Sequence, residues 1–373
     1  MEFNDLSLQY QHMKSDMDRA IQKVLDHGHY IMGPEVKELE EKLADYAGTK
    51  YCLSCSSGTS ALYLALRTLD LSKDDIVFVP DFTYFASGEA VDLTGGTPVF
   101  VDIDESYNIN PEALEKAIER VLEEGEKNPR AVVVVDLFGL PADYTKIEAI
   151  AEKYDLFLLP DAAQSFGSSY QGRKTGSLGD VTATSFFPAK PLGCYGDGGA
   201  VFTDDEELYN LMASLRVHGK GEDKYDNVRI GINARLDTLQ AAVLLTKLPY
   251  MDEERERKWE IAQAYTKGLK GAFDLPVFYD DRETALAQYT IRVKKAEDRE
   301  KVLKAMEEAK IPYNIYYKKA MHRQLAYADR TWDDKDFPVS LDFTGRVLSL
   351  PMHAYLSDEE VQTVIDVLLR TQE

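Results

Sequence analysis

The sequence predicts an α/β fold: a mainly parallel seven-stranded sheet covered by helices on both sides, followed by a smaller α+β domain. Three observations lead to this fold class. Short apolar runs alternate with helical segments from residue 51 to residue 203. One run, 131–135, is almost entirely valine, which is typical of a strand buried on both faces. The pattern changes after a charged helix at 247–259, so we divide the chain into domains at 1–250 and 251–373.

Two helices are expected before the sheet. The first occupies roughly the first 25 residues, where Met17, Ile21, Val24 and Leu25 recur at helical spacing. The second begins at the turn Gly33-Pro34, and Gly48 fits its C-terminal cap. Its apolar stripe consists of Val36, Leu39, Leu43 and Tyr46.

The strands of the sheet are expected at 51–53, 76–79, 98–101, 131–135, 156–159, 182–187 and 200–203. Helices are expected at 57–69 and 144–154, and another begins at Asn110, an N-cap followed by Pro111. In the smaller domain we expect strands at 289–293, 313–317 and 347–350 and a helix at 299–309. A capping box at Ser357-Glu360 predicts a last helix to about Arg370.

Composition excludes several classes of function. A formal net charge of −22 would repel a phosphate polyanion, so a nucleic-acid partner is not expected. No apolar run is long enough to span a bilayer and the N-terminus does not resemble a signal peptide, so we expect a cytoplasmic protein without a membrane partner.

Cysteine and histidine usage does not indicate a metal centre. Cys52 and Cys55 form a CxxC, but in a strand residues three apart point to opposite faces. We interpret the three cysteines as buried reduced thiols. The six histidines show no metal-ligand spacing, and no catalytic metal is predicted.

Lys190 stands between an apolar segment, 185–189, and the glycine-dense loop 191–199. A lone lysine is usually a solvated surface charge, but a lysine in this setting can also form an imine with a carbonyl compound. Polar groups at the carboxyl ends of the strands, where α/β sheets bind ligands, would favour the imine-forming lysine over the surface charge.

Three such groups follow strand ends. Gly58 and Thr59 open a helix whose N-terminus can bind a phosphate or be simply capped by a serine. Asp161 needs a partner such as a pyridinium nitrogen, unless it is a helix N-cap, and Gln164 would lie near the same ring. Tyr84 can stack on a planar ring or pack in the core. Together with Lys190 these groups are the parts of a pyridoxal phosphate site.

The chain resembles the DegT/DnrJ/StrS-type sugar aminotransferases, which are pyridoxal phosphate enzymes of fold type I. The resemblance runs nearly from end to end, through the segments 33–36, 57–59, 99–104, 161–164, 185–190, 231–237 and 350–353. It implies that Lys190 forms the imine with the cofactor and shuttles the proton, and that Asp161 keeps the pyridine nitrogen protonated.

The same resemblance assigns the remaining cofactor contacts. It implies that Gln164 bonds the ring hydroxyl, that Tyr84 stacks on the ring, and that the phosphate is bound by Gly58, Thr59 and Ser185. Asn233 resembles an asparagine that reaches the phosphate from the neighbouring subunit, which implies a homodimer with shared active sites.

The acceptor of such enzymes is usually a nucleotide-linked keto sugar and the donor is usually glutamate. The segment 190–199 most resembles members acting on UDP-linked 3-keto uronates for surface polysaccharides such as O-antigen. The substrate-binding residues implied are Gly28, Tyr30, Arg235, Tyr316 and Tyr317. Arg235 suits a carboxylate, although it can instead pair with Asp237.

Two positions depart from those members: Ala189 replaces a serine and Tyr316 replaces a histidine. A tyrosine cannot carry a positive charge at neutral pH, so a neutral UDP- or dTDP-linked 3-keto or 4-keto hexose is an alternative acceptor. Three other readings are weaker. A related dehydratase would have a histidine in place of Lys190. The presence of Lys190, Asp161 and Gln164 together argues against a non-catalytic sensor. The glycines of 193–199 do not match the GxGxxG motif of a nicotinamide enzyme.

Overall fold

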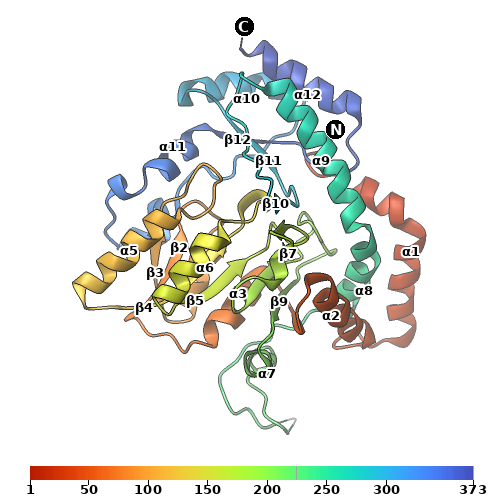
Figure 1. The fold of residues 1–373 in the computed structure, drawn as a ribbon. Coiled ribbons are helices and arrows are strands. Elements are labelled where there is room, and N and C mark those ends of the chain that lie inside the picture. The colour runs from red at the N-terminus through yellow and green to blue at the C-terminus, as the bar shows by residue number, and fades with distance from the viewer. Residues whose placement is uncertain (224, 373) are drawn as a thin grey trace.

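The central feature of the computed structural model, which describes residues 1–223 and 225–372, is a seven-stranded sheet (Figure 1). Its spatial order is β1-β9-β8-β5-β4-β2-β3. The strands are β1 (Tyr51–Cys55), β2 (Asp75–Pro80), β3 (Thr97–Val101), β4 (Asn128–Val135), β5 (Phe157–Asp161), β8 (Thr182–Ser185) and β9 (Gly199–Thr203). Only β9 in this sheet runs antiparallel to its neighbours, so the predicted mainly parallel sheet is confirmed.

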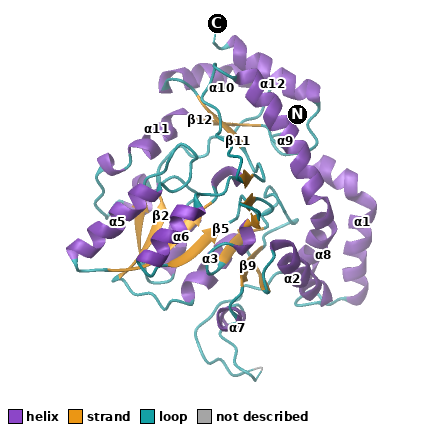
Figure 2. Ribbon diagram, viewed as in Figure 1, coloured by secondary structure: helices purple, strands orange, loops and turns teal. Residues whose placement is uncertain are grey.

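Helices cover both faces of this sheet (Figure 2). On one face the core includes α3 (Gly58–Arg67), α4 (Ala86–Leu93) and α7 (Glu206–Leu215). The other face packs against α5 (Pro111–Glu124) and α6 (Tyr144–Lys153) at one side and α1 (Leu6–His27), α2 (Pro34–Ala47) and α8 (Thr238–Lys247) at the other. The strand β4 is buried on both faces, as its valines predict.

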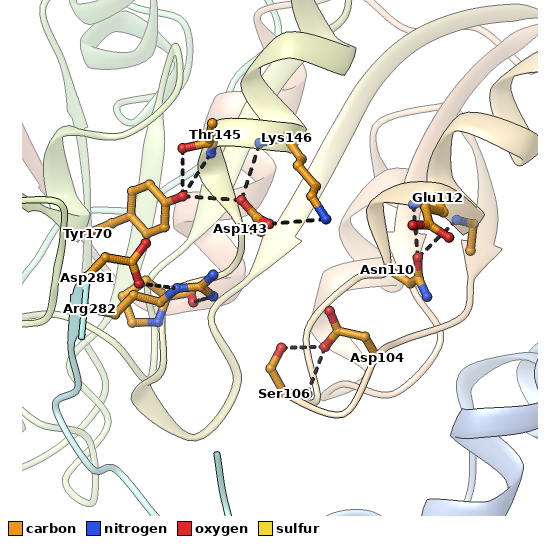
Figure 3. Close-up of polar contacts among 12 residues, drawn as sticks. Asp104, Ser106, Asn110, Glu112, Asp143, Thr145, Lys146, Tyr170, Asp281 and Arg282 are labelled. Atoms are coloured by element: carbon orange, nitrogen blue, oxygen red, sulfur yellow. Dashed lines mark hydrogen bonds and ion pairs between the residues drawn. The ribbon is translucent and has the colours of Figure 1, made fainter. Parts of the chain in front are cut away.

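Local signals account for the ends of several helices. The side chain of Asn110 accepts hydrogen bonds from the backbone of Glu112 at 2.9 Å and Ala113 at 3.2 Å (Figure 3). Gly48 takes a left-handed conformation at the end of α2, and Ser357 forms the predicted capping box with Glu360. Cys52 and Cys55 belong to core clusters on opposite faces of β1, and all three cysteines are buried and free.

The C-terminal part contains a two-stranded antiparallel sheet, β11 (Tyr289–Arg292) and β12 (Val347–Leu350). It shares a core with α9 (Met251–Leu269), α10 (Arg299–Glu308) and α12 (Asp358–Arg370). By contrast, α11 (Pro338–Arg346) packs through Phe343 on the core of the large sheet. The division at residue 250 therefore stays a prediction.

The strand predicted at 313–317 is wrong. Of these residues only Asn314 pairs with a strand, through an isolated bridge to Ser349. The apolar alternation reflects aromatic packing instead, because Tyr313 contacts the C-terminal core whereas Tyr316 and Tyr317 contact the core of the large sheet. The sequence reading also missed four helices, α4, α7, α8 and α11, and the small sheet of β6 (Ser169–Tyr170), β7 (Arg173–Lys174) and β10 (Arg282–Glu283).

Lys247, the last residue of α8, is an unusual buried charge. It is 3% exposed, and its Nζ has no hydrogen-bond partner among residues 1–223 and 225–372. The ring of Tyr195 lies 4.5 Å away. Burial lowers the pKa of Lys247 to about 8, against the opposing influence of Glu254. The side chain is therefore protonated at pH 7 at an energetic cost.

We expect Lys247→Met to raise the free energy of unfolding by about 1–2 kcal/mol at pH 7, because an apolar side chain of similar length replaces a poorly compensated charge. The folded-state pKa lies below the ordinary 10.5, so the cost is fully present below pH 8 and relieved between pH 8 and 10.5. The advantage of Met should shrink over that range in urea unfolding. Lys37→Met, at an exposed lysine, is the control; equal stability of both variants at pH 7 would refute the explanation.

Candidate active site

Lys190 and Asp161 lie at the same edge of the sheet, where β5 and β8 end. Asp161 is the last residue of β5, and Lys190 follows β8 in a loop closed by two hydrogen bonds of Phe186, to Cys194 at 2.8 Å and Gly198 at 2.7 Å. The loop needs its glycines: a Cβ on Gly193 would lie 2.2 Å from the carbonyl oxygen of Pro188. The sequence therefore forms a tight loop that presents the lysine.

Burial shifts the pKa values of Lys190 and Asp161 in favour of their neutral forms, and the charge of each group acts against the shift of the other. Desolvation lowers the pKa of the Lys190 amine, and Asp161 partly restores it. Burial raises the pKa of Asp161, against the hydrogen bond from the Ala163 amide at 3.1 Å and the charge of Lys190. The other carboxylate oxygen accepts from Ser87 Oγ at 3.1 Å. A lysine held toward its neutral form can act as a nucleophile, and a buried carboxylate favours a cationic partner.

Gln164 is oriented by the backbone. Its Oε1 accepts from the amide of Phe138 at 2.8 Å, which directs Nε2 toward the Tyr317 hydroxyl at 3.4 Å. Phe138 adopts a left-handed conformation with φ of 60°, and this turn aims its amide at the glutamine. Nε2 is thus presented as a donor, as required for a bond to an anionic ring oxygen.

The residues predicted to bind phosphate meet at the start of α3. Ser57 caps this helix by accepting from the Ser60 amide at 3.0 Å. Gly58 lies so close to Ser185, 127 residues away, that a Cβ on Gly58 would be 2.7 Å from the Ser185 Cβ. Thr59 occupies the first turn of α3. The helix N-terminus and the serine hydroxyl form a cradle that suits a phosphate.

Tyr84 lies in the loop between β2 and α4 and is 62% exposed, so the alternative of core packing does not occur. The loop is fastened by Asp81, which is fully buried. Its carboxylate accepts from the backbone amide of His322 at 2.8 Å and contacts the Nδ1 of the same histidine at 2.7 Å. This arrangement leaves the tyrosine ring free to cover a planar ligand.

The predicted substrate residues form two separate groups. Arg235 lines a cavity of about 580 Å³ together with Ser57 of the phosphate cradle and Asn233, the residue predicted to contact the cofactor phosphate. Tyr30 is joined to this group, because its carbonyl oxygen accepts from the Thr238 amide at 2.9 Å. Gly28 is the left-handed C-cap of α1. Tyr316 and Tyr317 do not line this cavity: Tyr317 contacts Gln164, and Tyr316 packs edge-on against Phe3.

Arg235 does not pair with Asp237, the alternative considered from the sequence. Its Nε is buried and has no hydrogen-bond partner in the described part of the chain. A guanidinium in a polar cavity with an unsatisfied donor favours an anionic ligand.

Sequence reasoning missed Ser87, Phe138, the Asp81–His322 pair and Asp136. The first three carry no recognisable local signal, because their roles depend on contacts between distant segments. Asp136 could have been found, since it follows a buried strand as Asp161 ends one. Among the described residues, no group of three or more His, Cys, Asp or Glu side chains could hold a metal ion, and no helix is long and apolar enough to cross a membrane.

A lysine of lowered pKa, a buried carboxylate, an oriented amide and a phosphate cradle at one edge of a mainly parallel sheet define a pyridoxal phosphate enzyme of fold type I. The model of the DegT/DnrJ/EryC1/StrS aminotransferase family matches residues 11–369. The chain belongs to this family, and the predicted enzyme class and cofactor are confirmed.

Several relatives cover nearly the whole chain. A Pseudomonas aeruginosa protein named UDP-2-acetamido-2-deoxy-3-oxo-D-glucuronate aminotransferase is 42% identical over 99% of both chains. A Geobacillus stearothermophilus protein named pleiotropic regulatory protein is 36% identical over 97% of this chain and 96% of its own. A crystal structure of a family member from Brucella abortus has a TM-score of 0.96 at 46% identity and 99% coverage of both chains. DesV of S. venezuelae, solved with a ketimine intermediate, has a TM-score of 0.94 at 36% identity, covering 100% of this chain and 98% of its own.

Proposed function

We propose that the protein transfers an amino group from L-glutamate to a UDP-linked 3-keto uronic acid, in the cytoplasm, during the synthesis of a surface polysaccharide such as O-antigen. The observation that carries the choice of acceptor is Arg235, which lines the cavity beside the phosphate cradle and has no ion-pair partner among the described residues. A uronate carboxylate would supply that partner. The name of the 42% identical Pseudomonas aeruginosa relative supports the same substrate class.

The chain's residues divide the work of this reaction. Bound pyridoxal phosphate supplies a reactive carbonyl carbon and an electron-withdrawing ring. Lys190, whose amine is held toward its neutral form by burial, would bind the carbonyl carbon of the cofactor and carry the proton between the substrate carbon and the cofactor carbon. Asp161 stabilises positive charge at the ring nitrogen, and Gln164 donates to the ring oxygen. The cradle at Gly58, Thr59 and Ser185 holds the phosphate.

The active form in this proposal is a homodimer with shared sites. The resemblance that assigns Asn233 to the phosphate of a neighbouring subunit supports this, and Tyr316 and Tyr317 do not line the cavity that contains Arg235. Exposed apolar side chains also surround the group that contains Arg235. Tyr30, Ile31 and Met32 are 45–49% exposed, and Ile230, between α7 and α8 in the chain, is 80% exposed. A second copy of the chain would bury these apolar side chains, which favours dimer formation.

We expect a panel of UDP- and dTDP-linked keto sugars with glutamate, analysed by mass spectrometry of the amino product, to show the UDP-3-keto uronate as the best acceptor. Arg235→Leu should lower kcat/KM for the uronate about 100-fold and that for the matching neutral hexose less than about 3-fold, because only the uronate loses a charged partner. Arg173→Leu, at an ion pair with Glu148 outside the site, is the control. Equal losses on both sugars would contradict the assignment of Arg235.

A neutral 3-keto or 4-keto hexose is a second candidate acceptor, and Tyr316 favours it. A phenol cannot carry a positive charge, and burial raises the pKa of Tyr316, so at neutral pH it offers a sugar only a neutral hydrogen-bonding group. Faster turnover of the neutral sugars in the same panel would establish this alternative. A non-catalytic sensor would turn over no sugar despite bound cofactor, but the assembly of Lys190, Asp161 and Gln164 supports catalysis.

A further inference from the structure

A second buried carboxylate stands beside Asp161 at the end of the sheet. Asp136 directly follows β4, and the last residue of that strand, Val135, lies opposite Asp161 on the parallel neighbour β5. The amide of Asp136 donates to the carbonyl oxygen of Asp161 at 3.2 Å. Asp136 is 0% exposed. Two acids of like charge are thus fixed on adjacent strands.

Hydrogen bonds connect Asp136 to the residues that hold Gln164. Its Oδ2 accepts from Ser165 Oγ at 2.8 Å, and Ser165 follows Gln164 in the chain. Its Oδ1 accepts from the Ala142 amide at 2.9 Å and the Tyr144 hydroxyl at 3.0 Å. These bonds close the turn 136–142, which contains the Phe138 amide that orients Gln164. The carboxylate therefore fastens both segments that meet at the glutamine.

The charge of Asp136 is sensitive to pH near neutrality. Burial raises its pKa to about 7, and the charge of Asp161 adds to this effect. The bonds from Ala142, Ser165 and Tyr144 act in the opposite direction. The titratable groups that face it are Asp161 on β5 and Tyr144 on α6, and burial keeps the phenol of Tyr144 neutral by raising its pKa. Asp136 is thus mainly ionised above pH 7 and mainly neutral below it.

We propose that Asp136 is a positioning residue that acts through Asp161 and Gln164: its charge reinforces that of Asp161 in keeping a proton on the pyridine nitrogen, and its hydrogen bonds fix the amide of Gln164. The inference rests on the cofactor chemistry of the proposed function, but not on the identity of the sugar. Two negative charges near the pyridine nitrogen raise its pKa more than one charge does. The titrations of the two carboxyl groups and the ring nitrogen are therefore coupled.

Asp136→Asn tests the electrostatic part. The amide can keep all three contacts, with Oδ1 accepting from Ala142 and Tyr144 and Nδ2 donating to Ser165, while the charge is lost. The ring nitrogen of bound ¹⁵N-labelled cofactor, followed by NMR as the pH is changed, should show a pKa lowered by about one unit. We also expect kcat to fall about 10-fold and the KM for the sugar to stay within about 2-fold.

Tyr144→Phe is the matched control, because it removes one hydrogen bond from the same carboxyl group but keeps the group ionisable. That bond lowers the pKa of Asp136, so its loss should reduce stability and move the Asp136 step in the ¹⁵N signal to higher pH without abolishing it. Wild-type holoenzyme provides a second test if Asp136→Asn does not fold: the ¹⁵N signal should contain a step near pH 7 that coincides with the ¹³C titration of the Asp136 carboxyl.

An unchanged ring-nitrogen titration in a folded Asp136→Asn holoenzyme, or no coincident step in the wild type, would overturn the proposal. These measurements need bound cofactor and no sugar. A failed sugar panel with an intact step would therefore refute only the proposed substrate, whereas a productive panel without the step would refute only the role of Asp136.

Discussion

Lys190→Ala should abolish the visible absorbance of lysine-bound pyridoxal phosphate and lower kcat at least about 1,000-fold, while the protein stays folded. The physical reason is that the substitution removes both the amine that binds the carbonyl carbon and the group that carries the proton. Lys190 is suited to both tasks, because desolvation lowers its pKa and Asp161 lies close enough to act on its charge. Absorbance spectra and single-turnover rates of the purified, cofactor-supplemented variants would measure the effect.

Two variants sharpen this result. Lys190→Arg keeps a positive charge but cannot form the imine, so it should fail as completely as alanine. Lys116→Ala, at an exposed lysine on α5, should leave the absorbance unchanged. Borohydride reduction followed by peptide mapping would identify the modified lysine, and the relevant competitor is Lys258. This second lysine lines the same cavity of about 40 Å³ as Lys190 and has a pKa lowered by burial to about 8. Labelling of Lys258 in place of Lys190 would contradict the assignment.

Asp161→Asn should weaken cofactor binding and lower kcat at least about 100-fold, because the ring nitrogen loses its anionic partner. We expect the opposite effect on the apoprotein, which should gain about 1 kcal/mol in the free energy of unfolding at pH 7. Burial raises the pKa of Asp161 in the folded state, so its ionisation opposes folding as the pH rises above the unfolded value. The asparagine can keep the bonds to Ala163 and Ser87 without this penalty.

Asp104→Asn is the matched control for Asp161. Burial also raises the pKa of Asp104, but its carboxylate accepts from the Ser106 amide at 2.8 Å, in the loop between β3 and α5 (Figure 3). Its replacement should change stability alone and leave cofactor affinity as in the wild type. Spectroscopic titration with cofactor and thermal unfolding of apo and holo forms would separate the two effects. Unimpaired cofactor binding by Asp161→Asn would refute the role given to this carboxylate.

The sheet could be predicted because its strands are short apolar runs with helical segments between them. Each run is apolar because helices on both faces of the sheet bury it. The caps at Asn110, Gly48 and Ser357 were also predictable, since capping depends on residues within one turn. The error at 313–317 has a physical basis: aromatic side chains that alternate along an irregular segment cannot be distinguished from a strand by periodicity alone.

The site was predictable in its parts and not in its assembly. Lys190, Asp161 and Gln164 could be named because a lysine before a glycine-dense loop and polar groups at strand ends together match the parts of a cofactor site, and the family resemblance implied a role for each. The contact of Gly58 with Ser185 and the orientation of Gln164 by Phe138 depend on packing between distant segments, which single-sequence patterns do not contain. The same is true of the separation between Arg235 and Tyr317.

That separation bears on how such an enzyme can change. Lys190, Asp161 and Gln164 lie at or after strand ends at the edge of the sheet, whereas Gly28 and Tyr30 lie at the end of a helix and Arg235 lies in an irregular segment. Mutations in the second set leave the buried packing of the first untouched. Substitutions in these segments can therefore change the acceptor while the cofactor chemistry stays the same. The same segments can be exchanged between related enzymes to alter the acceptor by design.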